Sequence, residues 1–222
     1  MSRNIQQLCY VAEALEELVH EVVFLGGCTT ALMVEELAAA EARATEDVDF
    51  IVDLTAWVEY NRLVNQLKSK GFYQSMDDTI ICRMRCDFNG IPLIVDVMPT
   101  DESILGFSNP WYAEAFKTSH RVNLPNGIEI RIPPSLLFLA TKLCAWNDRG
   151  KGDVLLSQDL EDIVYVLENR PRLPIEFREE NNEAVKAYIA QESKSLLANI
   201  DFLSYLPGTA RRDSRRVINK LP

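Results

Sequence analysis

The dipeptide Asn89-Gly90 constrains the fold most, because it lies between two runs of strand-forming residues, 80–88 and 91–97. Asn-Gly is favoured in two-residue β-hairpin turns, where both positions adopt positive φ angles. Such a turn fixes the register of the hairpin. Phe88 then faces Ile91, and counting back places Arg83 opposite Asp96. The sequence therefore predicts an antiparallel strand pair with an Arg83–Asp96 contact when metal is absent. The alternative is a plain cross-strand ion pair without catalytic meaning.

Hydrophobic periodicity and turn residues predict the remaining elements. In the first part of the chain we expect helices at 5–19, 29–42 and 57–70, strands at 22–25 and 48–52, and a second hairpin from 119–124 and 128–132. After Pro133-Pro134 the pattern is helical, at 135–148, 157–168 and 179–205. The prediction is an α/β (α+β) chain with a mixed sheet and flanking helices. A catalytic-type subdomain covers 1–132 and a mostly helical subdomain covers 133–222.

Two acidic residues alternate with apolar ones in the strand candidate at 48–52. Strand side chains alternate between faces, so Asp47 and Asp49 share one face while Val48 and Phe50 point to the core. Two carboxylates on one face repel each other unless a cation lies between them, and oxygen ligands suit Mg²⁺ or Mn²⁺. The alternative is a strand end with solvated acids.

A third acid, Asp96, lies within the apolar strand candidate 91–97. Burying a carboxylate without a partner is costly. If this strand lies beside the strand of Asp47 and Asp49, the three carboxylates converge. That arrangement forms a two-metal platform for phosphoryl or nucleotidyl transfer.

The glycine pair Gly26-Gly27 ends the strand candidate at 22–25 and precedes Cys28 and Thr29. Glycines let the backbone approach a ligand closely, and amides at a helix N-terminus bind anions such as a triphosphate. No Walker A motif follows. The alternative is a common strand–helix connection.

Lys142 is the only charged residue between Arg131 and Asp148. A lysine in so apolar a helix extends its ammonium to solvent or pairs with an anion. Asp159 and Asp162 are three positions apart and so share one helix face. The alternative to an anion site is a salt bridge that packs two helices together.

These residues resemble the nucleotidyltransferase fold of the DNA polymerase beta superfamily. Its pattern is a glycine turn, an Asp-x-Asp pair and a third Asp on a later strand, matched by Gly26-Gly27, Asp47/Asp49 and Asp96. The segment FLATKLCAWNDRGKGDVLLSQDLEDIVYVL (138–167) is similar to the lysine and aspartate motifs of AbiEii-like nucleotidyltransferases, toxins of bacterial toxin–antitoxin pairs.

The resemblance implies metal-dependent transfer of a nucleoside monophosphate from an NTP to an acceptor hydroxyl. It assigns Mg²⁺ or Mn²⁺ to Asp47, Asp49 and Asp96, with Asp96 also helping to deprotonate the acceptor. Nucleotide contacts are implied for a second set: Gly26, Gly27, Cys28, Thr29, Lys142, Asp159 and Asp162. Cys28 stands where the family usually has Ser, so a hydroxyl contact to phosphate would come from Thr29 or Thr30, or be absent.

The acceptor is left open between tRNA or another RNA, a protein, and a small molecule of the antibiotic type. A non-catalytic nucleotide- or partner-binding module of the same fold is a further alternative. The net charge of −10 repels phosphate backbones, so RNA binding would need a local basic patch. The candidate patch consists of the basic residues of the C-terminal segment 211–220. The alternative is a solvated terminal segment. A toxin would also have a cognate antitoxin as partner.

The five cysteines are scattered and form no Cys-x-x-Cys motif, which favours reduced core thiols in a cytosolic protein. The longest uncharged stretch, 132–141, contains two prolines and cannot span a bilayer. We therefore expect a soluble, cytoplasmic protein without a membrane partner.

Overall fold

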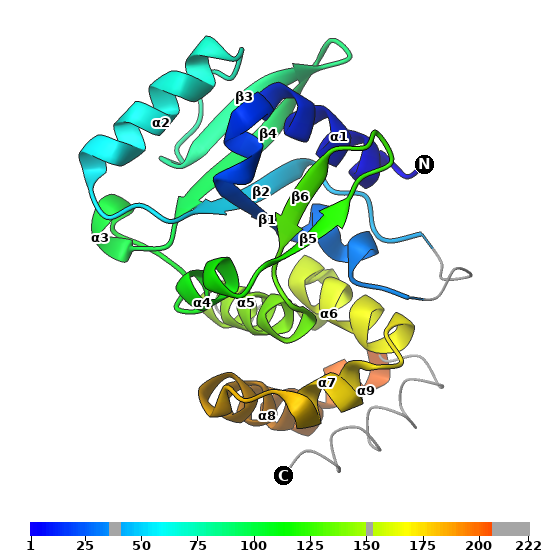
Figure 1. Ribbon diagram of the computed structural model, residues 1–222. Coiled ribbons are helices and arrows are strands. Elements are labelled where there is room, and N and C mark those ends of the chain that lie inside the picture. Colours follow the sequence, from blue (N-terminus) through cyan, green and yellow to red (C-terminus); the bar gives the residue numbers. More distant parts are fainter. Residues whose placement is uncertain (36–40, 150–152, 206–222) are drawn as a thin grey trace. The chain divides into compact units, whose positions relative to one another are not determined.

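The computed structural model describes residues 1–35, 41–149 and 153–205 (Figure 1). The chain divides into two compact units. Unit 1 comprises Met1–Ala31 and Arg43–Pro134, and unit 2 comprises Leu32–Ala42 and Ser135–Pro222. The separate functional roles expected for 1–132 and 133–222 stay a prediction. Within the described ranges, no helix combines the length and apolar character that crossing a bilayer requires.

Unit 1 contains a mixed four-stranded sheet in the order β1-β2-β4-β3, and a separate two-stranded sheet of β5 and β6. In the first sheet, β2 and β4 are parallel, whereas β1–β2 and β3–β4 are antiparallel. The elements are α1 (Arg3–Leu15), η1 (Glu16–His20), β1 (Val22–Leu25), η2 (Gly27–Leu32), β2 (Asp47–Val52), α2 (Trp57–Ser69), β3 (Arg83–Phe88), β4 (Ile91–Pro99), α3 (Glu102–Leu105), α4 (Tyr112–Lys117), β5 (His120–Asn123) and β6 (Glu129–Ile132).

The core of unit 1 lies between the four-stranded sheet and the helices that contact it. Val48 and Phe50 of β2 and Val95 and Val97 of β4 are fully buried. Helix α1 contacts β2, and the Tyr60 hydroxyl of α2 donates to the Val97 carbonyl at 3.0 Å. Because side chains alternate along a strand, burial of one face of β2 and β4 leaves the acidic positions on the other.

The hairpin around Asn89-Gly90 has the predicted register. Asn89 and Gly90 have φ angles of 56° and 80°. Phe88 pairs with Ile91, and the ladder continues to the pairing of Arg83 with Asp96. The expected strand start at residue 80 was wrong, because 80–83 form a turn in which the Arg83 amide donates to the Ile80 carbonyl at 3.1 Å. Strand β3 therefore begins at Arg83.

Unit 2 is helical in its described part. Its helices are α5 (Ser135–Asp148), η3 (Val154–Leu156), α6 (Gln158–Asn169), α7 (Leu173–Glu179), α8 (Glu183–Ala198) and α9 (Ile200–Tyr205). Helix α5 is buried on most of its surface and packs against α6, α7 and α8. An apolar sequence such as that of α5 is stable only when neighbouring helices cover it on several sides.

The expected helix at 29–42 was wrong in its described part. The structure contains only the short 3₁₀ helix η2 before residue 33, and residues 36–40 lie outside the described residues. The following segment is bound to the end of α6 instead. The Glu35 amide donates to the Asn169 carbonyl at 3.2 Å, and the Arg170 guanidinium donates to the Met33 carbonyl at 2.7 Å. These tertiary bonds replace the bonds of a helix.

The expected continuous helix at 179–205 was also wrong, because two asparagines divide it. Asn182 accepts hydrogen bonds from the amides of Ala184 and Val185 and begins α8. Asn199 is extended, ends α8, and accepts from the amides of Asp201 and Phe202. An asparagine side chain that captures free amides favours a cap over a helix interior.

Candidate metal centre

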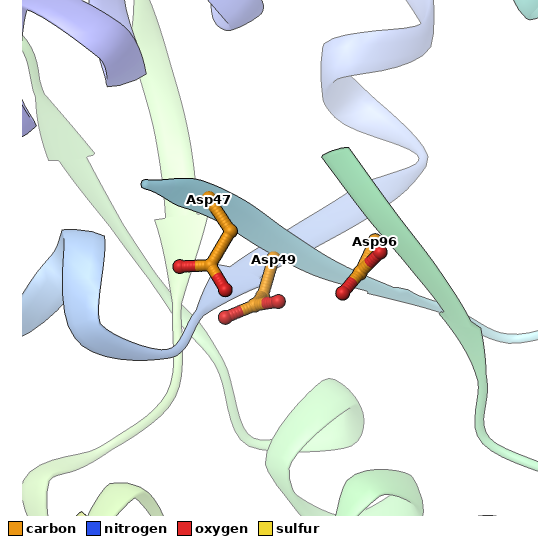
Figure 2. Close-up of side chains that lie close together, drawn as sticks. All are labelled: Asp47, Asp49 and Asp96. Atoms are coloured by element: carbon orange, nitrogen blue, oxygen red, sulfur yellow. The ribbon is translucent and has the colours of Figure 1, made fainter. Parts of the chain in front are cut away.

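The parallel pairing of β2 with β4 brings the three predicted aspartates together. Asp49 is the register partner of Asp96, and Asp47 pairs with Ile94 two positions earlier. Figure 2 shows the carboxylates of Asp47, Asp49 and Asp96 projecting to the same side of the two strands. One oxygen from each lies within 4.8 Å of the others. The predicted convergence of the three side chains is therefore confirmed.

Three carboxylates so close together repel one another, and the repulsion is stronger where water is partly excluded. Asp96 is buried, with 9% of its surface exposed, while Asp47 and Asp49 are half-buried. We call these three residues the aspartate triad. A set of oxygen donors alone, with this negative charge, matches the ligands that Mg²⁺ and Mn²⁺ prefer.

Arg83 neutralises one member of the aspartate triad. Its Nε donates to Asp96 Oδ1 at 2.9 Å, and its Nη2 donates to Asp96 Oδ2 at 2.8 Å. This two-pronged bond, with the charge of Asp96, raises the pKa of Arg83 above its ordinary value. The predicted Arg83–Asp96 contact is confirmed.

Gly26 makes room for the carboxylate of Asp49. Its φ is +78°, a conformation that L side chains rarely adopt, and an added Cβ would overlap the Asp49 carboxylate, 2.8 Å from its Cγ. Both restrictions require glycine at this position. The close approach of Asp49 thus explains why the first position of the predicted turn is glycine.

The two residues that follow the glycines are buried and bonded within the turn. The Thr29 hydroxyl donates to the Gly26 carbonyl at 2.9 Å, and the Cys28 thiol donates to the Leu25 carbonyl at 3.3 Å. Their expected contacts with a nucleotide, like those of Gly26 and Gly27, stay predictions.

In unit 2, the predicted Lys142, Asp159 and Asp162 form a buried cluster between α5 and α6. The Lys142 Nζ lies 2.7 Å from Asp162 Oδ2 and 3.3 Å from Asp159 Oδ1. The exposed fractions are 9% for Lys142, 3% for Asp159 and 2% for Asp162. This is the helix-packing salt bridge that the sequence allows. The expected role of the three residues in nucleotide binding stays a prediction.

Arg149 completes this cluster, and sequence reasoning did not assign it. Its Nη1 lies 2.6 Å from Asp159 Oδ2, while most of its side chain remains exposed. The available signal was charge balance, because two buried carboxylates require more than the single positive charge of Lys142. The basic segment 211–220, proposed as an RNA contact, lies outside the described residues.

The cysteines match the expectation of reduced core thiols, since all five are free and buried. Burial raises the pKa of Cys82 to about 12, and the negative charges of Asp96 and Asp49 contribute. The Cys82 thiol is therefore protonated at neutral pH and is a poor nucleophile.

No model of a known protein family matches the sequence, and no curated protein matches it. Among solved structures, the chain is similar to an antigenic nucleotidyltransferase-like protein from Paracoccidioides brasiliensis. The two share 18% identity with a TM-score of 0.57, over 98% of this chain and 93% of that chain. The protein has a nucleotidyltransferase-like fold. The aspartate triad lies on the central strands of this fold. The narrower resemblance to AbiEii-like toxins stays a prediction.

Proposed function

We propose that this protein is a metal-dependent nucleotidyltransferase that transfers a nucleoside monophosphate from an NTP to an acceptor hydroxyl. The observation that carries the proposal is the convergence of Asp47, Asp49 and Asp96 within 4.8 Å on two adjacent parallel strands. The nucleotidyltransferase-like fold supports it, and the sequence resemblance assigns metal ligation to the same three aspartates.

The triad fits a divalent cation on two grounds. Its donors are carboxylate oxygens alone, and Gly26 leaves the space that the Asp49 carboxylate needs. Asp47, Asp49 and Asp96 would hold the metal. The bound metal would supply charge stabilisation for the entering and leaving oxygens of the transfer.

The protein side chains then have distinct tasks. Asp47 and Asp49 would hold the metal, whose positive charge would then attract the triphosphate. Asp96 accepts the proton of the acceptor hydroxyl on one of its carboxylate oxygens as a general base. The acceptor oxygen forms a bond to the α-phosphorus, the bond from that phosphorus to the β-phosphate bridging oxygen breaks, and pyrophosphate leaves with the electron pair.

For the acceptor, we propose an RNA hydroxyl, with tRNA as the first substrate to examine. The support is the similarity of 138–167 to AbiEii-like toxins. On the same basis we propose a cognate antitoxin as partner. The NTP contacts proposed for unit 2 are Lys142, Asp159 and Asp162. These residues form buried ion pairs between α5 and α6, two packed helices of unit 2.

The proposal is tested with each α-³²P-labelled NTP, Mg²⁺ or Mn²⁺, and total tRNA, protein or an aminoglycoside in separate reactions. Asp47→Asn/Asp49→Asn is the inactive variant. Asp53→Asn is the matched control, because Asp53 follows the same strand and bonds to Thr100 outside the triad. Label on RNA that requires Asp47 and Asp49 supports the proposal. Label on protein or aminoglycoside alone changes the acceptor class. NTP binding without label on any acceptor identifies a non-catalytic module.

A further inference from the structure

We infer that Arg83 competes with the divalent cation for Asp96, so that the metal binds only when the Arg83–Asp96 ion pair opens. This inference rests on the metal site of the proposed function. It assigns Arg83 as a positioning residue, because it acts on the site through the carboxylate of Asp96.

The first observation is that Arg83 uses both oxygens of Asp96. Nε bonds to Oδ1 at 2.9 Å and Nη2 bonds to Oδ2 at 2.8 Å. The β3–β4 register places the two residues directly opposite each other, so the backbone maintains the contact. Both side chains are largely shielded, with exposed fractions of 20% for Arg83 and 12% for Asp96. An ion pair shielded in this way is screened less by salt than a surface pair.

The second observation concerns charge. A divalent cation bound to an oxygen of Asp96 would lie about 2.0–2.6 Å from that oxygen. Each oxygen of Asp96 already has an Arg83 nitrogen within 3 Å. Two positive groups on one carboxylate repel each other in a partly dehydrated site. Arg83 therefore supplies in the metal-free triad the positive charge that the cation supplies when it is bound.

The chain contains a matched control two positions along the same strand. Arg85 makes the same two-pronged bond to Asp78, with Nε–Oδ2 at 2.9 Å and Nη2–Oδ1 at 2.6 Å. The exposed fractions of this pair, 25% and 8%, are close to those of Arg83 and Asp96. Asp78 is not part of the triad. Substitution of Arg85 thus removes an equivalent ion pair without removing a competitor of the metal.

The test is calorimetric titration of Mn²⁺ into the full-length wild type, Arg83→Gln and Arg85→Gln. We expect Arg83→Gln to bind Mn²⁺ at least about ten-fold more tightly than wild type, equivalent to 1.4 kcal/mol. Arg85→Gln should bind with the wild-type Kd. An unchanged or weaker affinity in Arg83→Gln overturns the inference, as does an equal gain in Arg85→Gln.

A measurement on the wild type removes any dependence on how well the variants fold. The Nε–H groups of Arg83 and Arg85 both donate to carboxylates, which slows their exchange with water. In ¹H–¹⁵N spectra, Mg²⁺ should shift or broaden the Arg83 Nε–H signal and leave that of Arg85 unchanged. An Arg83 signal that keeps its position and width at saturating Mg²⁺ overturns the inference.

The two proposals fail in distinguishable ways. If Mn²⁺ binds the wild type and Arg83→Gln equally, only the competition is wrong and the metal-dependent transferase remains. If neither protein binds Mn²⁺, both proposals are wrong.

Discussion

The carboxylate of Asp49 fills the space in which a side chain at Gly26 would lie, so Asp49 requires glycine at position 26. Gly26 directly follows β1, and Asp49 belongs to β2, whose antiparallel ladder with β1 pairs Leu25 with Asp49. The turn that follows β1 therefore passes directly against a triad carboxylate. This close approach explains why a residue without a side chain is needed there.

Gly26→Ala should reduce Mn²⁺ affinity at least about ten-fold, because the new methyl group displaces the Asp49 carboxylate. Gly90→Ala is the control, since Gly90 has a similar φ of +80° but open space around it. Both variants carry the backbone cost of about 1–2 kcal/mol for a side chain in this conformation. Only Gly26→Ala should lose metal affinity in calorimetry. Equal Mn²⁺ affinity in the two variants would contradict the prediction.

Asp49→Asn and Asp96→Asn should affect the metal-free protein differently, although both remove a triad charge. Asp96→Asn leaves Arg83 without its carboxylate and should destabilise the protein by about 1–3 kcal/mol. Asp49→Asn relieves repulsion within the triad and should change stability by less than about 0.5 kcal/mol. Thermal unfolding without metal measures the difference, at about 2–4 °C per kcal/mol for a chain of this size.

The same two variants should both lose the stabilisation that added Mn²⁺ gives to the wild type, because bound ligands stabilise the folded state. Asp53→Asn should retain it. If Mn²⁺ raised the Tm of Asp49→Asn as much as it raises the Tm of the wild type, the cation would bind elsewhere.

Lys142→Met should destabilise the protein by about 3–5 kcal/mol, because it leaves Asp162 buried without its ammonium partner at 2.7 Å. Lys117→Met is the control. Lys117 pairs with Glu114 at 3.9 Å on the surface, and its loss should cost less than about 1 kcal/mol.

The double variant Lys142→Met/Asp162→Leu tests whether this cluster has a second role. Replacing both partners by apolar side chains should recover most of the lost stability. If the recovered protein also binds NTP with wild-type affinity, the predicted nucleotide role of Lys142 is wrong. A stable variant that has lost NTP binding supports that role.

The ionised carboxylate of Glu176 contributes stability that the protein loses at acid pH. Burial raises its pKa, but hydrogen bonds from Arg170 and Ser135 outweigh this, and the net shift is downward from 4.5. A lowered pKa gives stability that is fully present above pH 4.5 and is lost as the pH falls through the folded-state pKa. Glu176→Gln should therefore lower Tm at pH 7, and its Tm should fall less than that of the wild type between pH 5 and 3. Parallel Tm profiles for the two proteins would contradict this.

Two features of the triad could be predicted because short-range rules determine them. Strand alternation places Asp47 and Asp49 on one face, and the two-residue turn at Asn89-Gly90 fixes Arg83 opposite Asp96. The adjacency of β2 and β4 was a condition in the sequence argument, because strand order depends on tertiary packing rather than on local pattern.

The failures have tertiary or side-chain causes. Residues 33–35 have helix-forming neighbours, yet Arg170, far along the chain, binds the Met33 carbonyl. Asn199 lies in a helical pattern, but its side chain captures the amides of Asp201 and Phe202. In each case a bond that periodicity does not encode decides the local structure.

The parallel pairing of β2 and β4 has a consequence for biosynthesis. Asp49 and Asp96 are neighbours in the sheet, but α2 and β3 lie between them along the chain. The ribosome must therefore release the chain up to about the end of β4 before the three carboxylates can come together. Pairing of strands that are far apart in the sequence is slow compared with the formation of local contacts. The cation site of the proposed function can thus form only once the four-stranded sheet is complete.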